Sequence, residues 1–424
     1  MMDNDGRKHL VIIGAGFAGL KLARKLNNHP DFQITLIDKN NYHQFQPLLY
    51  QVASANLDAS NVSFPLRNIF KRSKNVSIRI GEVFGINQET NKLETSFGRL
   101  GYDYLIIATG AITNFFGNSQ IESRTFPMKS TLEALQIRNT MIQHFEDALS
   151  SKLADIETSL SIVVVGGGPT GVEMSGALAE LKRDTLPLEY PELDFTKMQV
   201  ILLEGGPKLL GTMSKVSSQK SESYLKDMGV TVMTNSLVKE YDGHTIILQN
   251  GTSIESSLVI WAAGVKGTYP AGIPTNTVTA NQQLKTEQNN LLIGSENIFV
   301  VGDVAMMESE EFPKGYPQLA SVAIGQAENL ANNFIRMAKG QAILPYKFVD
   351  KGSMATVGRN KAVVDMAWPK WSFQGFFAWL VWMGLHLFLL IGFKNKIVVF
   401  INWVYKYFTF RQSLSLLFKP LARK

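Results

Sequence analysis

The chain has 424 residues, of which 45% are hydrophobic and 18% are charged. This length exceeds what one hydrophobic core usually organises, so we expect at least two folded domains. Cysteine is absent, which excludes disulfides, thiol catalysis and cysteine-ligated metal centres. The six histidines lack the close spacing of a metal-binding motif, so redox chemistry in this chain needs an organic cofactor and no metal site is expected.

The first fifty residues predict a dinucleotide-binding unit. A buried strand, His9–Ile13, leads through a glycine turn into a helix, Phe17–Leu26, and a second buried strand, Gln33–Ile37, ends at Asp38. The turn carries the three glycines of a GxGxxG fingerprint, Gly14, Gly16 and Gly19. In this arrangement the glycines admit a tight turn, a nearby pyrophosphate and close helix packing, and the acid accepts a hydrogen bond from a ribose hydroxyl. The alternative is a glycine turn without a ligand.

The same order of elements recurs from residue 160. A strand, Leu160–Val165, precedes a second glycine turn and the helix Val172–Leu181, and the strand Gln199–Leu203 ends in Glu204. The turn reads Gly166, Gly167, Gly168, Pro169, Thr170 and Gly171. No arginine accompanies Glu204, and this acid repels a 2′-phosphate, so the second site favours NADH over NADPH.

Three further strands end in glycine-bearing turns. Tyr104–Ile107 is followed by Ala108, Thr109 and Gly110; Val259–Ala262 by Ala263 and Gly264; and Ile298–Val301 by Gly302 and Asp303. A carboxylate directly after a buried strand can cap a helix. In a chain with two dinucleotide fingerprints, we interpret Asp303 as a contact to a flavin ribityl chain.

The C-terminal segment differs from the rest of the chain in charge and in hydrophobicity. Residues 366–424 contain eight basic and no acidic residues, whereas residues 1–365 contain the other 34 basic and all 36 acidic residues. Five of the six tryptophans also lie in this segment. A basic, apolar and Trp-rich segment favours a membrane surface over nucleic acid. A dimer interface or a part of the domain core are the alternatives.

Two apolar runs in this segment predict how it meets the membrane. The 18-residue run 376–393 lies at the short end of the range of about 17–25 residues that cross a bilayer, and His386 interrupts it. We expect His386 to make a structural hydrogen bond. The run Ile397–Phe410 places Asn402, Lys406 and Thr409 on one helical face, which predicts a helix lying in the interface. Each basic residue near anionic headgroups adds roughly 1 kcal/mol.

Together the motifs resemble the flavoproteins with two dinucleotide-binding domains, and among them the type II NADH dehydrogenases, or NADH:quinone oxidoreductases. The resemblance is carried by residues 45–53 (FQPLLYQVA), 166–173 (GGGPTGVE), 261–265 (WAAGV) and 379–402. It implies an α/β fold of two Rossmann-like, glutathione-reductase-like domains with a C-terminal helical membrane-anchoring module. The implied boundaries are 1–115 and 285–345 for FAD, 116–284 for NADH and 346–424 for the module.

The resemblance also implies the residues at each site. For FAD these are Gly14, Gly16, Phe17, Ala18, Gly19, Asp38, Lys39, Pro47, Val83, Ala108, Thr109, Gly110, Gly302, Asp303, Leu319, Ala320 and Ser321. For NADH they are Gly166, Gly168, Pro169, Thr170, Gly171, Glu173, Glu204, Ala263 and Gly264. Glu173, Gln318 and Ser321 are the implied catalytic residues. Alternatively, Glu173 is only an acid favoured by the dipole of its helix.

The acceptor helix departs from the family pattern. The family has two glutamines in an AQxAxQ stretch that line the quinone site, and this chain has Ser321 and Gly325 there. Gln318 and Gln326 flank these positions, and either one is a candidate substitute. The alternative is that residues 319–334 form a helix that only packs on the flavin domain.

The resemblance implies that hydride passes from NADH to FAD and that two electrons then reach a membrane quinone without proton pumping. The start of the chain lacks a signal-peptide pattern, so we expect the enzyme on the cytoplasmic side of the cell inner membrane, with a homodimer as a further option. The absence of cysteine excludes disulfide reductases and sulfide:quinone reductases. Two alternatives are a flavin reductase that serves a ferredoxin-like carrier and a non-enzymatic NADH sensor.

Overall fold

The computed structural model describes residues 6–150, 160–409 and 416–417. The chain forms two compact units, a first unit of residues 1–43, 64–112 and 265–349 and a second unit of residues 44–63, 113–264 and 350–424. In this division, residues 265–284 belong to the first unit and residues 350–424 to the second unit.

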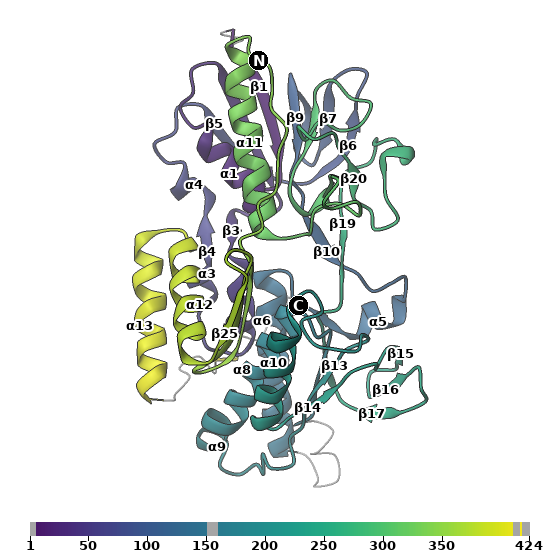
Figure 1. Cartoon of the computed structure of the whole chain (residues 1–424), viewed down its shortest axis with the longest axis vertical. Coiled ribbons are helices and arrows are strands. Elements are labelled where there is room, and N and C mark those ends of the chain that lie inside the picture. The colour runs from purple at the N-terminus through teal and green to yellow at the C-terminus, as the bar shows by residue number, and fades with distance from the viewer. Residues whose placement is uncertain (1–5, 151–159, 410–415, 418–424) are drawn as a thin grey trace, which may run out of the picture. The chain divides into compact units, whose positions relative to one another are not determined.

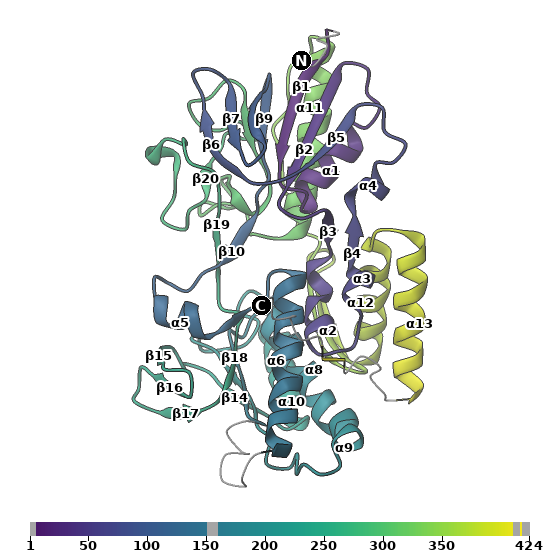
Figure 2. The same ribbon diagram turned by 180° about the vertical axis from the view of Figure 1, so that it is seen from behind.

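The first unit contains a five-stranded parallel sheet (Figures 1 and 2). Its strands are β1 (Lys8–Ile13), β2 (Phe32–Asp38), β5 (Val76–Ile80), β9 (Tyr104–Ile107) and β21 (Ile298–Val300), in the order β21-β9-β1-β2-β5. The strand order reverses beside β1, since β2 lies on one side of it and β9 on the other. In open α/β sheets, ligands bind at the carboxyl ends of the strands at such a point.

Two helices of the first unit, α1 (Phe17–Lys25) and α11 (Ala320–Ala338), pack against each other. An antiparallel sheet consists of β6 (Val83–Asn87), β7 (Lys92–Thr95) and β8 (Gly98–Gly101). Shorter elements are β3 (Tyr42–Gln44), β4 (Ser63–Pro65), α4 (Leu66–Ile69), β10 (Ala111–Thr113), β19 (Val265–Gly267), η4 (Thr275–Thr277), β20 (Leu284–Lys285), η5 (Gly302–Val304) and β22 (Ala305–Met306).

The second unit repeats the plan of the first. Its parallel sheet has the order β11-β18-β12-β13-β14, formed by β11 (Phe126–Pro127), β12 (Ile162–Val165), β13 (Val200–Leu203), β14 (Val230–Met233) and β18 (Leu258–Trp261). The helices are η1 (Gln46–Leu48), α2 (Leu49–Ala53), α3 (Ala59–Val62), α5 (Ser119–Arg124), α6 (Thr131–Ser150), α8 (Pro169–Glu180), η3 (Leu181–Thr185), α9 (Leu186–Glu189) and α10 (Lys215–Asp227). An antiparallel sheet joins β15 (Val238–Tyr241), β16 (Thr245–Leu248) and β17 (Ser253–Glu255).

The C-terminal part of the second unit is a three-stranded antiparallel sheet followed by two helices. The strands are β23 (Ser353–Gly358), β24 (Lys361–Met366) and β25 (Trp371–Gln374), and the helices are α12 (Phe376–Leu389) and α13 (Phe393–Thr409). The apolar run 376–393 is therefore not one helix, because the chain turns at Gly392, which has a φ of +82°. Within the described ranges, no helix has the length and apolarity to cross a bilayer.

Candidate functional site

The two glycine fingerprints have the same geometry. A Cβ on Gly14 would lie 2.3 Å from the Ala108 carbonyl oxygen, and a Cβ on Gly166 would lie 2.7 Å from the Ala262 carbonyl group. These two glycines let the first strand of each sheet end against its neighbour at the reversal point. A Cβ on Gly19 or Gly171 would overlap the carbonyl oxygen of Gly14 or Gly166, so only glycine permits this close helix packing.

Both fingerprints also leave room for a phosphate. A Cβ added to Gly16 or Gly168 would meet nothing within 4 Å. These glycines are the N-caps of α1 and α8, and neither helix has a side-chain cap or an acidic residue in its first turn. The start of each helix, which is the positive end of its dipole, therefore lies beside open space, which suits a pyrophosphate. Pro169 and Thr170, in the first turn of α8, are both exposed.

The two acids at the strand ends brace the glycine turns. Asp38 accepts hydrogen bonds from the backbone N–H groups of Ala15 and Asn40, both at 2.7 Å. Glu204 likewise accepts from Gly167 and Gly206, both at 2.6 Å. Burial raises the pKa of Asp38, although these N–H groups lower it in part. A carboxylate accepts about four hydrogen bonds, so both acids retain capacity for a ribose hydroxyl.

The remaining FAD candidates lie in several settings. Thr109 donates its hydroxyl proton to the Thr268 carbonyl, and Gly110 has a φ of +71°. Val83 begins β6 with its side chain in the core of the first unit. Lys39 is exposed and forms an ion pair with Glu82. Pro47 lies in η1 and belongs to the second unit.

At the second fingerprint, Ala263 and Gly264 follow β18 as expected. Gly264 has a φ of +78°, and a Cβ there would lie 2.9 Å from the Phe116 ring. The Trp261 indole donates to the carbonyls of Asn114 and Ala263, which fixes this strand end.

At the start of α11, some of the candidate residues are exposed and others bond to the protein backbone. Leu319 is the N-cap of α11 and is exposed, and Ala320 and Ser321 form the first turn, with Ser321 exposed. Gln318 and Gln326 instead hold the backbone of the turn that carries Asp303. At Gly325, a Cβ would lie 2.6 Å from the Tyr346 hydroxyl. A larger side chain at 325 is therefore incompatible with Tyr346 in its present place.

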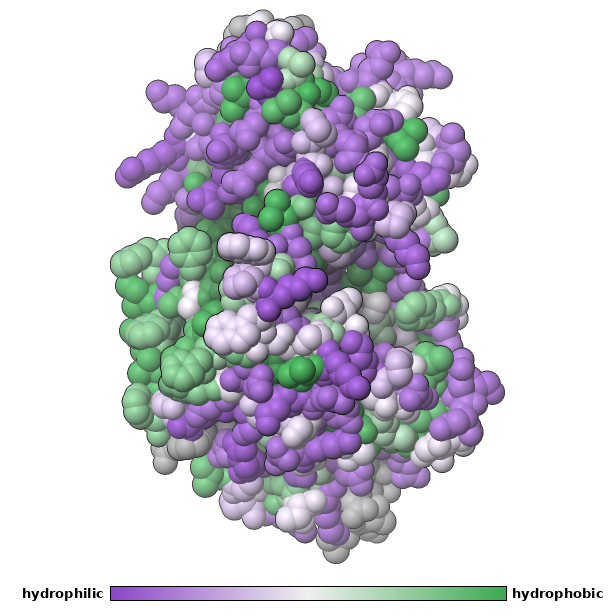
Figure 3. Space-filling view, viewed as in Figure 1, coloured by the Kyte–Doolittle hydropathy of each residue, from purple (hydrophilic) through white to green (hydrophobic). Residues whose placement is uncertain are grey.

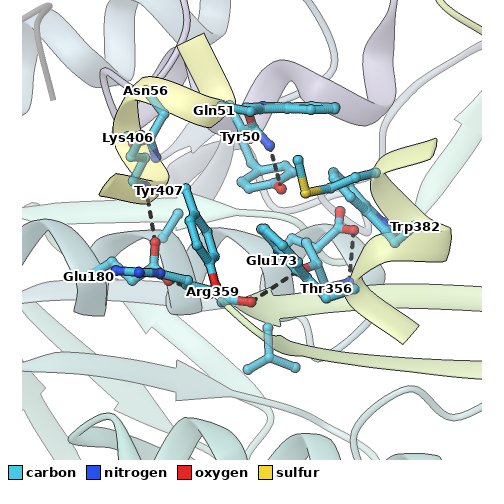
Figure 4. A pocket seen from close by; sticks show the side chains of 16 residues that line it. Tyr50, Gln51, Asn56, Glu173, Glu180, Thr356, Arg359, Trp382, Lys406 and Tyr407 are labelled. Atoms are coloured by element: carbon cyan, nitrogen blue, oxygen red, sulfur yellow. Dashed lines mark hydrogen bonds and ion pairs between the residues drawn. The ribbon is translucent and has the colours of Figure 1, made fainter. Parts of the chain in front are cut away.

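A pocket of about 600 Å³, counted with its open mouth, lies within the second unit (Figure 4). Its walls come from α2, α8, β23, α12 and α13. The lining residues are Tyr50, Gln51, Asn56, Glu173, Ala177, Glu180, Thr356, Val357, Gly358, Arg359, Trp379, Trp382, Met383, Trp403, Lys406 and Tyr407. The helix that carries the second fingerprint thus shares a pocket with the two C-terminal helices.

Glu173 lies at the apolar side of this pocket. It is 8% exposed, and its carboxylate accepts a long hydrogen bond of 3.4 Å from the Thr356 backbone N–H. Burial raises the pKa of Glu173 to about 8, and the Thr356 N–H offsets this only in part. At neutral pH the carboxyl is therefore mostly protonated. Figure 4 shows Tyr50, Glu173 and Trp382 directed toward the same space.

A chain of hydrogen bonds reaches Tyr50 from α13. The Trp403 indole donates to Gln51 at 2.8 Å, and the Gln51 amide donates to the Tyr50 hydroxyl at 2.8 Å. Because the Tyr50 oxygen accepts from Gln51, its own proton is directed elsewhere. Burial and the nearby carboxyl of Glu173 raise the pKa of Tyr50 well above its usual range, so it remains a donor.

The opposite side of the pocket is charged. Lys406 forms an ion pair with Glu180 at 3.0 Å, and the Arg359 backbone N–H donates to the same carboxyl group at 2.5 Å. Burial alone raises the pKa of Glu180, but the charge of Lys406 and the N–H of Arg359 bring it below its ordinary value. The Arg359 guanidinium lies over the Tyr407 ring, 4.1 Å from its centroid.

Lys406, which the sequence places on the polar face of an interfacial helix, pairs with Glu180 of the protein itself. Its helix does have a polar face, but Asn395, Trp403 and Lys406 use that face to bind α3, α2 and α8. Lys396 bonds the Phe388 carbonyl, whereas Lys370 and Lys394 are exposed. His386 bonds the Trp382 carbonyl at 2.7 Å as expected, and burial lowers its pKa to about 4. Arg411, Lys419, Arg423 and Lys424 lie outside the described residues.

The outer face of α12 and α13 is an exposed apolar surface, seen as a green area in Figure 3. We call it the apolar helix surface, formed by Phe376, Phe377, Leu380, Val381, Leu385, Phe388, Leu389, Phe393, Ile397, Phe400, Ile401, Val404, Tyr405 and Phe408. A continuous exposed apolar surface on two neighbouring helices is typical of contact with a membrane or with another protein.

The pocket adds residues that the sequence analysis did not name as site candidates, namely Tyr50, Gln51, Glu180, Arg359, Trp403 and Tyr407. Tyr50 and Gln51 do lie in the segment 45–53 that carries the family resemblance. Glu180 had a usable signal, because it lies seven residues after Glu173 and so on the same face of α8. The others are brought together only by the tertiary fold. No cluster of potential metal ligands occurs among the residues that the structure describes.

Known protein families match both the dinucleotide-binding part of the chain and its C-terminal part. The model of the pyridine nucleotide-disulphide oxidoreductase family matches residues 8–327, and that of the NDH2 C-terminal domain matches residues 351–412. NdhA, a type II NADH:quinone oxidoreductase of Mycobacterium tuberculosis, is 36% identical over 416 residues, covering 94% of this chain and 87% of the relative. The type II NADH:quinone oxidoreductase of Staphylococcus aureus is 30% identical, covering 84% of this chain and 89% of the relative.

Among solved structures, NDH2 of Plasmodium falciparum in complex with NADH has the same fold. It superimposes with a TM-score of 0.87 over 95% of this chain and 98% of that chain, at 22% identity. The α/β architecture expected from the two fingerprints is thereby confirmed.

Proposed function

Since the chain belongs to the pyridine nucleotide-disulphide oxidoreductase family, in the group of the type II NADH:quinone oxidoreductases, we propose that it oxidises NADH through bound FAD and reduces a membrane quinone. The observation that carries this proposal is the pocket that holds the buried carboxyl of Glu173, built jointly by the fingerprint helix α8 and the two C-terminal helices. In this proposal the second unit contains both the NADH site and the pocket that α12 and α13 help to line, and the outer face of these helices is the apolar helix surface.

FAD and NADH fit the glycine fingerprints, whose helix N-termini and open middle glycines suit two pyrophosphates. In this assignment the first fingerprint, Asp38, Asp303 and the start of α11 hold FAD, and the second fingerprint and Glu204 hold NADH. Bound FAD supplies hydride acceptance and release of two electrons. The protein positions both groups and excludes water.

The pocket of the second unit is the proposed quinone site. Reduction of a quinone to a quinol consumes two protons with two electrons. Glu173 carries a proton at neutral pH, and the Tyr50 hydroxyl, which accepts from Gln51, has its own proton to donate. Both groups face an apolar cavity, where a donor to a quinone carbonyl gains strength from the low dielectric.

The apolar helix surface supports attachment of the enzyme to a membrane, which we assign to the cytoplasmic face. The observed α12 and α13 lie beside the pocket, so a lipid-dissolved acceptor reaches it without entering water. A second copy of the chain is the other occupant that this surface suits, and the test below separates the two.

Purified holoenzyme on anionic lipid vesicles tests the proposal. We expect NADH consumption to require a quinone such as a short-chain menaquinone or ubiquinone, and enzyme to co-sediment with vesicles. Faster turnover with a ferredoxin than with quinone would favour the protein-carrier alternative. Flavin reduction by NADH without quinone-dependent turnover would favour the sensor. A dimer in detergent that fails to sediment with lipid would assign the apolar helix surface to dimerisation.

A further inference from the structure

The turn that carries Asp303 is held by three glutamine side chains of the first unit. The Gln326 carbonyl oxygen accepts from the Gly302 N–H at 2.8 Å. On the other side, Gln318 donates to the Asp303 carbonyl at 2.8 Å, and Gln283 donates to the same carbonyl at 3.2 Å and to the Ala305 carbonyl at 3.1 Å. The backbone of Asp303 is therefore bracketed by side-chain amides before and after the residue.

This turn needs such partners because it leaves the regular sheet. Gly302 follows β21 with a φ of +81°, a conformation that favours glycine, and the chain then makes the 3-10 turn η5. Gly302 is buried, so its N–H has no water to bond. A buried N–H without an acceptor is costly, and Gln326 is the acceptor that the fold supplies.

Burial holds the Gln326 side chain in this contact. Its side chain is 1% exposed and lies on the inner face of α11, where it packs among other buried residues of that helix. Gln318, which is half-buried, directs its amide to Asp303 from just before the helix. The Gln326 oxygen and a Gln318 N–H are thus both taken up by the backbone of the Asp303 turn.

We propose that Gln326 and Gln318 are positioning residues for the flavin: they fix the Gly302–Asp303 turn so that the Asp303 carboxylate is held toward the ribityl chain. The two glutamines nearest to the altered acceptor motif therefore serve the cofactor and not the acceptor. This inference rests on the proposed role of Asp303 in FAD binding.

The test compares Gln326→Leu with a matched control on the same helix, Asn333→Leu. Asn333 is 2% exposed, and its amide also bonds backbone, at the N–H and carbonyl of Leu344, away from the Asp303 turn. Both variants lose a buried amide from α11. The measurements are the FAD dissociation constant of the apoprotein, by quenching of flavin fluorescence, and the visible circular dichroism of bound flavin.

We expect Gln326→Leu to raise the FAD dissociation constant about tenfold and to change the flavin dichroism, and Asn333→Leu to leave both within twofold. Gln326→Glu keeps an oxygen acceptor and restores the affinity. Gln318→Leu, at the less buried position, provides the same test with less risk to folding. The KM for quinone stays within twofold in all four variants.

Equal FAD affinities in Gln326→Leu and Asn333→Leu overturn the inference, as does a raised quinone KM with normal FAD affinity. Asp303→Ala separates this failure from that of the underlying assignment. Normal flavin retention in Asp303→Ala removes the role of Asp303 itself. Loss of flavin in Asp303→Ala with normal retention in Gln326→Leu removes only the positioning role.

Discussion

Replacement of Glu173 by glutamine removes the buried carboxyl while preserving its size and the polar atom that accepts from Thr356. Burial raises the pKa of this carboxyl to about 8 from an ordinary 4.5. At about 1.4 kcal/mol per pH unit, that difference corresponds to about 5 kcal/mol in the free energy of unfolding. The folded state binds the extra proton between these two values, so the stability contributed by the neutral acid is complete below pH 4.5 and is lost as the pH rises toward 8.

The assay compares thermal unfolding of the wild type and Glu173→Gln at pH 5, 6, 7 and 8. Between pH 5 and pH 7 the wild type should lose about 2.5 kcal/mol relative to the variant. For a unit of this size, that loss lowers the melting temperature by about 5–10 °C relative to the variant. Glu192→Gln, at an exposed position of the same unit, controls for the removal of one carboxyl. If the melting temperatures of the wild type and Glu173→Gln change equally between pH 5 and pH 8, Glu173 does not titrate in this range.

Glu204→Gln removes the charge and keeps an oxygen acceptor for only one of the two backbone N–H groups, Gly167 or Gly206, which bond to different carboxylate oxygens. Without the charge, kcat/KM for NADPH relative to NADH should rise about tenfold, and an unchanged ratio rejects the assignment. The double variant Phe388→Ser, Phe393→Ser should bind vesicles at least tenfold more weakly than the wild type, because each exposed ring contributes about 2 kcal/mol on insertion. Phe84→Ser, an exposed position in β6, is the control. Equal vesicle binding by the double variant and the wild type contradicts the membrane role of the apolar helix surface. Lys406→Met leaves the buried Glu180 without its ion-pair partner and should lower the free energy of unfolding by about 3 kcal/mol. Adding Glu180→Gln should restore this stability. A double variant as unstable as Lys406→Met argues against the ion pair.

The spacing of residues predicted the parts of the molecule that depend on local backbone geometry. The two fingerprints needed only the order strand, glycine turn, helix, strand and acid, and the structure places Gly14 and Gly166 against neighbouring strands for the same steric reason. The two C-terminal helices, α12 and α13, were likewise predicted from the local hydrophobicity of residues 376–410. In these regions neighbouring residues along the chain determine the structure.

Other features depend on contacts between residues distant in sequence, which spacing does not reveal. Gly325 is explained by Tyr346, and the direction of Gln326 is explained by Gly302. Helical periodicity identified a polar face on α13 but not that this face binds the protein, which is why Lys406 pairs with Glu180 and does not face lipid.

Anaerobic rapid mixing of the holoenzyme on vesicles tests whether electrons from NADH leave through FAD to a lipid-dissolved quinone. We expect NADH to bleach the flavin absorbance in one phase, and quinone in the membrane to restore it at a rate no slower than steady-state turnover. Flavin that stays reduced in the presence of quinone, or is reoxidised far more slowly than NADH is consumed, would contradict it.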